Sequence, residues 1–481
     1  MFSGLTGFLF ILLITGGWCA DARAIPPRIL DEGVAIPLSL EEAVLLGIRN
    51  NRGVQTAYLQ RISQKFDLYV SEGKFFPKLT IASSYTNNVA DGIKTNTKGL
   101  ATTASMSLPT GATLTASSTN SSGNGGVSPS STTLTLAQPL LRNGGIEANT
   151  ASVRMARIDE QINQLNLGAT ISQTVVQIIY AYRELLRAQE QKKIAEAALK
   201  RSRELYEVNK ALISAGRMAE VELIQTEAEV ANQEVALEEA NNQIDATRLA
   251  LLNLLALEPS TAVVASALEI SAAKGQSLAQ ALAVALENQP DYLISLLSIE
   301  RAKINLDFAK NQRLWDVSLV AGQSQTQGNG FAGTAGASSS YTGLQITVPI
   351  GDRTLEQAVV HASVGLKNQN LRTQDVRQVL EQRIRDAVRN VQTRWRQFEL
   401  SKKARELTVL KLNIENEKLK AGRSSNFQIL VFEGDLRNAE NAQLNAQIAY
   451  LNALTDLDDK MGKILDAWRI PIVESAGLID L

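Results

Sequence analysis

The stretch Ser39-Leu40-Glu41-Glu42-Ala43 recurs as Ser277-Leu278-Ala279-Gln280-Ala281, and each copy opens a segment whose apolar residues have helical spacing. Two further landmarks recur in the same order in both halves. They are Gln138-Pro139-Leu140 with Val348-Pro349-Ile350, and Ala215-Gly216-Arg217 with Ala421-Gly422-Arg423. A repeat of this length indicates one unit of secondary structure that is used twice. The sequence therefore predicts an internally duplicated chain.

Each half contains a very long helical segment. Apolar residues keep three-and-four spacing from residue 148 to about 213, and again from 353 to 419, with no Pro in either stretch. At about 1.5 Å per residue, roughly 65 residues make a rod near 100 Å long. A Gly follows each rod, and the partner segments, about 221–257 and 427–464, should fold back antiparallel. We expect one long helical hairpin per half.

The partner segments are rich in Ala, Asn and Gln, as in residues 438–446. Small and amide side chains allow a helix to pack against two neighbours and remain wet on a third face. An ordinary solvated coiled coil is the alternative, although a two-stranded seam favours larger apolar residues.

Between the helices of each half, the pattern changes to the alternation typical of strands. Leu344, Ile346 and Val348 alternate with Gln345 and Thr347, and similar runs lie near residues 132–136 and 317–321. Segments rich in Gly, Ser and Asn, residues 120–131 and 328–340, are expected to be exposed loops. The polar face is Thr, Ser and Gln, which suits a hydrated lumen.

The alternation predicts about four strands per chain, and four strands cannot close a membrane barrel alone. The chain must then share its sheet with copies of itself; a soluble sandwich on a helical stalk is the alternative. Residues 104–116 resemble an additional hairpin around Pro109-Thr110-Gly111. Whether that hairpin enters the membrane or folds outside it stays open at this stage.

Composition excludes several classes of function. The 481 residues carry a net charge of −1, which gives little support for non-specific nucleic-acid binding. One His and one Cys cannot form a zinc site, a Cys/His nucleophile pair or a disulfide. Gly328-Asn329-Gly330-Phe331-Ala332-Gly333 has the spelling of a dinucleotide fingerprint but lacks the strand-to-helix context. We expect no enzyme activity, catalytic residue, cofactor or metal site.

Residues 1–24 have an apolar run from Phe8 to Ile14, followed by Ala22-Arg23-Ala24, which is typical of a secretory signal peptide. A short buried helix is the alternative, and lipid attachment at Cys19 stays open. Beyond this segment no run of about 18 apolar residues exists, so no membrane-spanning helix is expected.

The strand-to-helix passage Gln138-Pro139-Leu140-Leu141-Arg142-Asn143-Gly144, the two Ala-Gly-Arg tips and the duplicated order resemble the TolC-like outer membrane efflux family from Ser39 to about Trp468. The resemblance implies a mixed α and β fold in which a homotrimer shares a twelve-stranded outer-membrane barrel and a helical tunnel across the periplasm. It implies partners, a periplasmic adaptor and an inner-membrane pump, and a cargo of drugs, metal ions or polypeptides. The location implied is the outer membrane of a Gram-negative-type bacterium.

The resemblance also implies roles for particular residues. Ala215, Gly216, Ala421 and Gly422 are expected at the hairpin tips, where an adaptor docks, and Pro77, Pro139 and Pro349 at the strand–helix transitions. The family commonly has an acidic ring about six residues past the second tip Gly, and here that position is Gln428. We therefore expect Glu220 and Glu222 to line a gate, with Arg217 and Arg423 as latches between hairpins.

The expected domain bounds follow from these landmarks. They are a signal peptide 1–24, an extension 25–38, a first repeat 39–260 (strands about 78–138, hairpin about 148–257), a linker 261–276, a second repeat 277–468 (strands about 316–349, hairpin about 353–464) and a tail 469–481. The main function expected is a passive channel for an efflux pump or a type I secretion system. A filament-like stalk protein and the periplasmic adaptor are the alternatives; an adaptor has one hairpin between compact β domains, whereas two are expected here.

Overall fold

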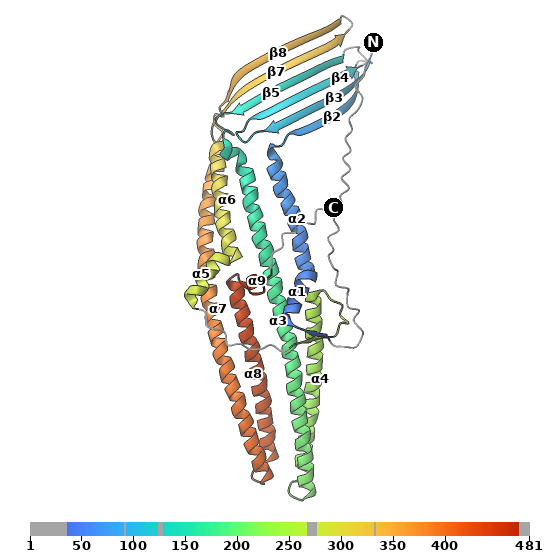
Figure 1. Ribbon diagram of the computed structural model, residues 1–481, viewed down its shortest axis with the longest axis vertical. Helices are drawn as coiled ribbons and strands as arrows, with labels where there is room; N and C mark the ends of the chain where they lie inside the picture. Colours follow the sequence, from blue (N-terminus) through green and yellow to red (C-terminus); the bar gives the residue numbers. More distant parts are fainter. Residues whose placement is uncertain (1–35, 91–92, 124–127, 267–276, 331–332, 471–481) are drawn as a thin grey trace.

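The computed structural model describes residues 36–90, 93–123, 128–266, 277–330 and 333–470. One β-sheet lies at one end of an elongated molecule, and two long helical hairpins extend from it to the opposite end (Figure 1). The predicted signal peptide, including Cys19, and the last residues of the predicted tail lie outside the described residues. None of the described helices combines the length and apolarity that crossing a membrane requires.

The two hairpins are built from four long helices. The first hairpin consists of α3 (Ile146–Ser214, 69 residues) and α4 (Val221–Leu255), and the second of α7 (Thr354–Lys420, 67 residues) and α8 (Asn426–Lys460). At about 1.5 Å per residue, α3 and α7 are each about 100 Å long. They cover the stretches in which three-and-four spacing predicts helix, and the partners fold back beside them (Figure 1).

Shorter helices precede the strands of each half. In the first half these are α1 (Leu40–Asn50), α2 (Arg52–Glu72) and the 3₁₀ turn η1 (Gly73–Phe75); in the second they are α5 (Leu278–Asn288) and α6 (Pro290–Gln312). The repeated Ser residues start α1 and α5, because Ser39 forms a capping box with Glu42 and Ser277 with Gln280. The order of two helices, antiparallel strands and a long helical hairpin occurs in both halves, with four strands of the main sheet in the first half and two in the second.

The main sheet has six antiparallel strands in the order β2-β3-β4-β5-β7-β8. Their bounds are β2 (Lys78–Ala90), β3 (Ile93–Ser107), β4 (Thr113–Gly123), β5 (Ser128–Pro139), β7 (Asp316–Gly330) and β8 (Gly333–Thr347). The prediction of about four strands per chain is therefore wrong. Large apolar residues are sparse in β3 and β4, so alternation revealed only the ends of these strands, near residues 104–116.

The segments predicted as exposed loops, residues 120–131 and 328–340, are mostly strand as well. Asn120 pairs with Ser130 at the end of the β4–β5 ladder, and Ser338 pairs with Gln325 within the β7–β8 ladder. Their Gly, Ser and Asn content favours loops only where no neighbouring strand offers backbone hydrogen bonds. Here the described residues of both segments have partners on neighbouring strands, so strand pairing prevails over composition.

A hydrophobic core lies midway along the long helices, where the strand that precedes α1 meets the strand that precedes α5. The strands β1 (Ile36–Leu38) and β6 (Val263–Ala265) pair in parallel beside α3, so part of the predicted linker is ordered as a strand. Tyr182 of α3 is fully buried there, and its hydroxyl donates to the carbonyl oxygens of Leu38 and Ser266 at 2.8 and 3.0 Å. Leu251, Leu255 and the short helix α9 (Ile464–Ala467) complete this core. It fixes the sheet and the hairpins relative to each other.

Candidate functional site

One face of the six-stranded sheet carries a band of exposed apolar side chains. The register places Leu114 opposite Leu136 and Leu319 opposite Leu344, so that these side chains point to the same face. Every strand contributes to the band. Its large members, 39–66% exposed, are Leu79, Ile81, Tyr85, Val89, Leu100, Leu114, Leu134, Leu136, Leu319, Leu344 and Ile346. Soluble monomers rarely expose a contiguous apolar area of this extent, so the band requires a covering phase or partner.

The opposite face of the same strands is lined with hydroxyl groups. Thr103, Thr115 and Thr135 stand on this face, and the hydroxyl of Thr133 donates to that of Ser324 on the neighbouring strand at 3.5 Å. A face of Thr and Ser with few charges can be wetted. The sheet is thus apolar on one side and hydrophilic on the other, as the alternation predicts.

The six-stranded sheet has two free edges, one at β2 and one at β8. Strands β2 and β8 each pair on one side only, and a free strand edge presents unpaired N–H and C=O groups. Three helices carry large apolar side chains that are more than half exposed: α2, which precedes β2, α7, which follows β8, and α4, which lies nearer the tips (Figure 1). On α2 and α4 these are Leu59, Phe66, Tyr69, Val221, Ile224 and Val235, and on α7 they are Val360, Leu371, Leu400, Leu407, Leu410 and Ile414.

Both hairpin tips end their long helix in the same way. Gly216 has φ +70° and Gly422 φ +68°, a left-handed conformation that favours glycine. The N–H of Arg217 donates to Leu212 O at 2.9 Å, and the N–H of Arg423 to Lys418 O at 2.8 Å, which closes a Schellman motif at each tip. Ala215, Gly216, Ala421 and Gly422 are exposed. The turns that join α3 to α4 and α7 to α8 lie at the end of the molecule farthest from the sheet (Figure 1).

A buried polar cluster joins the two hairpins just behind the tips. Asn209 of α3, Thr226 of α4 and Asn426 of α8 are at most 1% exposed. Asn209 Nδ2 donates to Thr226 Oγ1 at 2.7 Å and to Asn426 Oδ1 at 2.8 Å, and Asn426 Nδ2 donates to Thr226 Oγ1 at 3.1 Å. Buried polar groups are costly unless paired, so this cluster specifies how the two tips meet. We call these three residues the tip cluster.

The predicted gate residues surround the tip cluster. Glu222 is half-buried, its carbonyl oxygen accepts from Asn426 Nδ2 at 3.3 Å, and its Oε2 is buried with no hydrogen-bond partner among the described residues. Gln428 is half-buried in the first turn of α8, where its N–H donates to Ser425 Oγ at 3.3 Å. Glu220, Arg217 and Arg423 are exposed. The structure brings Glu222 to the cluster, whereas no ion pair within the described chain joins either Arg to Glu220 or Glu222.

At a greater distance from the tips, two arginines of α3 bind α8. Arg201 donates to Glu433 Oε2 at 2.7 Å and lies 3.6 Å from Glu440 Oε2, and burial raises the pKa of Glu433 while Arg201 opposes this rise. Arg183 is 7% exposed and donates to Leu451 O at 2.8 Å, Asn452 Oδ1 at 3.1 Å and Thr455 Oγ1 at 2.8 Å. Burial lowers the pKa of Arg183 to about 10.

The three predicted prolines lie at the ends of strands. Pro77 directly precedes β2, Pro139 is the last residue of β5, and Pro349 follows β8 by two residues. Proline has no N–H to donate to a ladder and disfavours helix in the preceding residue. Pro77 therefore separates η1 from β2, whereas Pro139 and Pro349 mark where β5 and β8 end before the next helix.

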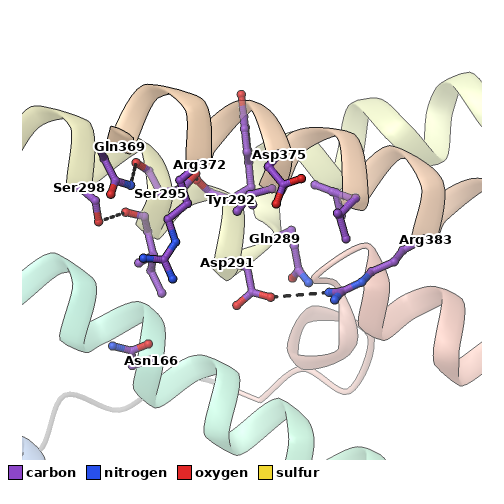
Figure 2. A pocket seen from close by; sticks show the side chains of 14 residues that line it. Asn166, Gln289, Asp291, Tyr292, Ser295, Ser298, Gln369, Arg372, Asp375 and Arg383 are labelled. Carbon is purple, nitrogen blue, oxygen red and sulfur yellow. Dashed lines mark hydrogen bonds and ion pairs between the residues drawn. The ribbon is translucent and has the colours of Figure 1, made fainter. Parts of the chain in front are cut away.

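A cleft of about 640 Å³ lies among α3, α6 and α7 (Figure 2). Its charges are mixed: Asp291 lies 4.0 Å from Arg383, with Arg372 and Asp375 nearby (Figure 2). The hydroxyls of Ser295 and Ser298 donate to carbonyl oxygens of their own helix at 2.7 and 2.8 Å. Neither serine is therefore paired with a base. No group of three or more His, Cys, Asp or Glu that could hold a metal ion exists within the described ranges.

Sequence reasoning missed the tip cluster and the two arginines that hold α8. A signal was present, since Ala198, Leu199, Ser202, Leu205 and Asn209 form one buried stripe of α3 at three-and-four spacing. An Asn in such a stripe is typical of a helix contact whose register is specified by a polar pair.

Comparisons with known proteins agree with this architecture. The sequence model of the family described as "Outer membrane efflux protein" matches residues 72–257. The solved outer membrane protein VceC of Vibrio cholerae has 16% identity and a TM-score of 0.68, with 88% of this chain and 96% of that chain covered. A search of curated proteins finds no match.

Two further solved structures have the same arrangement. The CmeC outer membrane channel of Campylobacter jejuni has 16% identity and a TM-score of 0.67, covering 88% of this chain and 85% of that one. The open state of the MtrE outer membrane channel of Neisseria gonorrhoeae has 16% identity and a TM-score of 0.66, covering 89% of each chain. The resemblance to TolC-like outer membrane efflux proteins is therefore confirmed: residues 72–257 match the outer membrane efflux protein family, and the chain has the fold of outer membrane channels.

Proposed function

We propose that this protein is the outer-membrane channel-tunnel of a tripartite efflux pump or a type I secretion system. It conducts substrates passively from an inner-membrane pump across the periplasm and the outer membrane. The observation that carries the proposal is the sheet, which is apolar across all six strands on one face and rich in hydroxyls on the other. A closed sheet with lipid on its apolar face and water on its polar face is the one β-structure that a membrane accepts.

The two free edges support assembly with further copies of the chain, and the resemblance to the efflux channels supports a homotrimer. A heterologous contact, in which the β2 edge meets the β8 edge of the next copy, closes into a ring. The exposed apolar residues of α2 and α4 would then face those of α7 from the neighbouring copy. Both the barrel and a hollow helical tunnel arise from this one contact.

The lengths of α3 and α7 support the cellular placement. With the sheet in the outer membrane of a Gram-negative-type bacterium, rods about 100 Å long extend far into the periplasm. The exposed tips, with Ala215, Gly216, Ala421 and Gly422, are then presented to the inner membrane. We propose these tips as the docking surface for the periplasmic adaptor of the pump.

The gate in this proposal lies at the tips. Glu222 and Glu220 supply negative charge at the constriction, with Gln428 close by, and Arg217 and Arg423 contact hairpins of neighbouring copies. The tip cluster supports the proposal because it couples the two hairpins of one chain directly behind these residues. Opening requires the two tips to separate or rotate, and the cluster resists that motion.

The test is the mass in detergent and the heat-sensitive gel mobility of the protein extracted from outer-membrane fractions. The expected result is a heat-sensitive species of three chains, each 52.1 kDa before any processing. A monomer released with the soluble periplasmic fraction would overturn the proposal and favour a stalk or adaptor protein.

A further inference from the structure

We propose that the β3–β4 hairpin is part of the membrane wall, so that a ring of three copies closes an eighteen-stranded barrel instead of a twelve-stranded one. This inference rests on the proposed function and deepens it. Six strands in each of three copies make the eighteen. Four strands per copy would make twelve, and the difference is this one hairpin.

The hairpin occupies the interior of the sheet and is not attached to its rim. All of β2, from Lys78 to Ala90, pairs with β3, and β4 pairs with β5 from Thr113 to Asn120. A hairpin that folded outside the membrane would leave β2 to pair with β5 directly. In the structure both strands of the hairpin separate β2 from β5, so neither can leave without breaking two ladders.

The apolar band crosses the hairpin at the end nearer the helices, through Met106 and Leu114, whereas farther along the strands Leu100 lies opposite Asn120 of β4. Leu114 lies between Met106 of β3 and Leu136 of β5 in the register, and Leu100 lies opposite Ser83, on the face that Ile81 shares. Leu100 is 46% exposed and Leu114 is 39% exposed. These values are similar to the 48% of Leu134 and the 43% of Leu136. Near the helices the hairpin therefore offers lipid the same apolar surface as its neighbours.

A tyrosine and a lysine lie opposite each other on the apolar face of the β2–β3 pair, and Val89, which is 63% exposed, lies farther along β2 on the same face. Tyr85 lies opposite Lys98, and both point to the apolar face. Tyrosine and lysine are typical of the boundary between hydrocarbon and headgroups, because each combines an apolar stem with a polar end. β3 thus shares with β2 this tyrosine–lysine pair as well as one apolar face.

The turn of the hairpin fits into the junction between β5 and α3. Thr110 O accepts from the N–H of Gly145 at 3.1 Å and from Gln138 Nε2 at 3.3 Å. Gly111, with φ +97°, leaves no room for a Cβ, which would clash with the carbonyl oxygen of Asn143. The strand–helix junction is shaped around this turn, so the hairpin is an integral part of the sheet.

The consequence is a wider barrel than twelve strands would give. Barrel diameter grows roughly linearly with strand number, and 16–18 strands are enough to leave an open aqueous channel. The hydroxyl-rich residues Thr103, Thr115 and Ser117 of the hairpin would line this channel. The membrane section is then not the narrowest part of the conduit, and control of passage rests with the hairpin tips.

Single-cysteine labelling of the channel in phosphatidylcholine vesicles tests the inference. In a background with Cys19, the only cysteine of the sequence, replaced by Ser, Leu114→Cys and Thr115→Cys report on the hairpin. Their register partners Leu136→Cys and Thr135→Cys on β5 serve as matched controls. Because lipid excludes charged groups, a charged water-soluble maleimide should react about tenfold or more slowly at positions 114 and 136 than at 115 and 135. A lipid-soluble maleimide should react at 114 and 136.

The outcomes separate the inference from the proposed function. Fast reaction of Leu114→Cys with the charged reagent, while Leu136→Cys stays protected, would place the hairpin outside the membrane and overturn the inference alone. Fast reaction of both would remove the membrane assignment itself. A detergent mass of two chains would give a twelve-stranded ring and overturn the count of eighteen. Leu100→Cys, at another exposed position, repeats the test if Leu114→Cys does not assemble.

Discussion

Asn209 and Asn426 lie in different halves of the chain, 217 residues apart, yet Asn209 Nδ2 donates to Asn426 Oδ1 at 2.8 Å in a site from which solvent is excluded. Each comes from a different hairpin, so the bond is a direct tie between the two tips. Thr226 shares its hydroxyl with both amides and completes the tie.

We expect Asn426→Ala to loosen the tips. The substitution leaves Asn209 without one of its acceptors and Glu222 O without its amide donor, which should cost about 1–3 kcal/mol. Single-channel recordings in planar bilayers should show more frequent or larger openings than wild type. Asn413→Ala, at an exposed position of α7 near the same tip, is the control and should behave as wild type. Equal conductance of the two variants would mean that the tie does not restrain opening.

Glu222→Lys should change conductance and shift ion selectivity toward anions. Glu222 is the second residue of α4 and is half-buried. Its Oε2 has no hydrogen-bond partner among the described residues. Reversal of its charge in three copies alters the field at a narrow site strongly. Reversal potentials in a salt gradient measure the effect, and Glu227→Lys, one turn along and exposed, is the control. If only Glu227→Lys alters selectivity, Glu222 does not line the constriction.

The pH dependence of stability should carry a contribution from Glu433. Burial raises its pKa in the folded protein above the ordinary value of 4.5. As the pH rises past 4.5, the carboxyl group of Glu433 is deprotonated in the unfolded chain while it is still protonated in the folded protein. The free energy of unfolding therefore falls until the pH exceeds the pKa of Glu433 in the folded protein. Glu433→Gln should remove this contribution and reduce the loss of stability between pH 4 and pH 7. Thermal unfolding followed by circular dichroism measures the difference.

The control for this prediction is Glu234→Gln. Glu234 also pairs with an arginine of α3, Arg203 at 2.7 Å, but about half of its side chain is exposed. Exposed pairs contribute little to stability, so this variant should keep the pH profile of the wild type. Identical profiles for all three proteins would show that Glu433 ionises equally easily in both states.

Much of the helical architecture could be predicted from the sequence, because its signals are local. Three-and-four spacing marks α3 and α7, and Ser39 and Ser277 mark the starts of α1 and α5 through capping boxes. The glycines of the tips were also readable, since Gly216 and Gly422 end an uninterrupted apolar pattern. Each of these features is decided within a few residues along the chain.

The features that the sequence did not reveal depend on contacts between distant segments. Asn120 and Ser338 lie in segments predicted as loops, and they become strand because other strands pair with them. The partners of Asn209 are 17 and 217 residues away, and those of Arg201 more than 230. No local pattern shows which polar side chain will be buried by such a contact.

Gly422→Ala should destabilise the second tip. A residue with a Cβ pays about 1–2 kcal/mol in the left-handed conformation that Gly422 adopts. The hydrogen bonds of the Schellman motif that ends α7 would weaken, and the first turn of α8 would be less stable. Gly365→Ala, in the interior of α7 with open space around it, should instead be neutral or stabilising, because Ala favours helix. Limited proteolysis at the tips compares the two; equal cleavage rates would contradict the prediction.

Gly111→Ala should selectively weaken the junction between the sheet and α3. A methyl group at this position meets the carbonyl oxygen of Asn143 and the amide of Asn149, and the left-handed backbone of Gly111 adds strain, together about 1–3 kcal/mol. Gly343→Ala on β8 has open space and ordinary backbone geometry, so it serves as the control. The heat-sensitive gel mobility should convert to the monomer at a lower temperature for Gly111→Ala than for Gly343→Ala. Since only a hairpin that is seated in the wall can transmit this strain to the assembly, unchanged conversion would mean that the turn does not bear on the barrel.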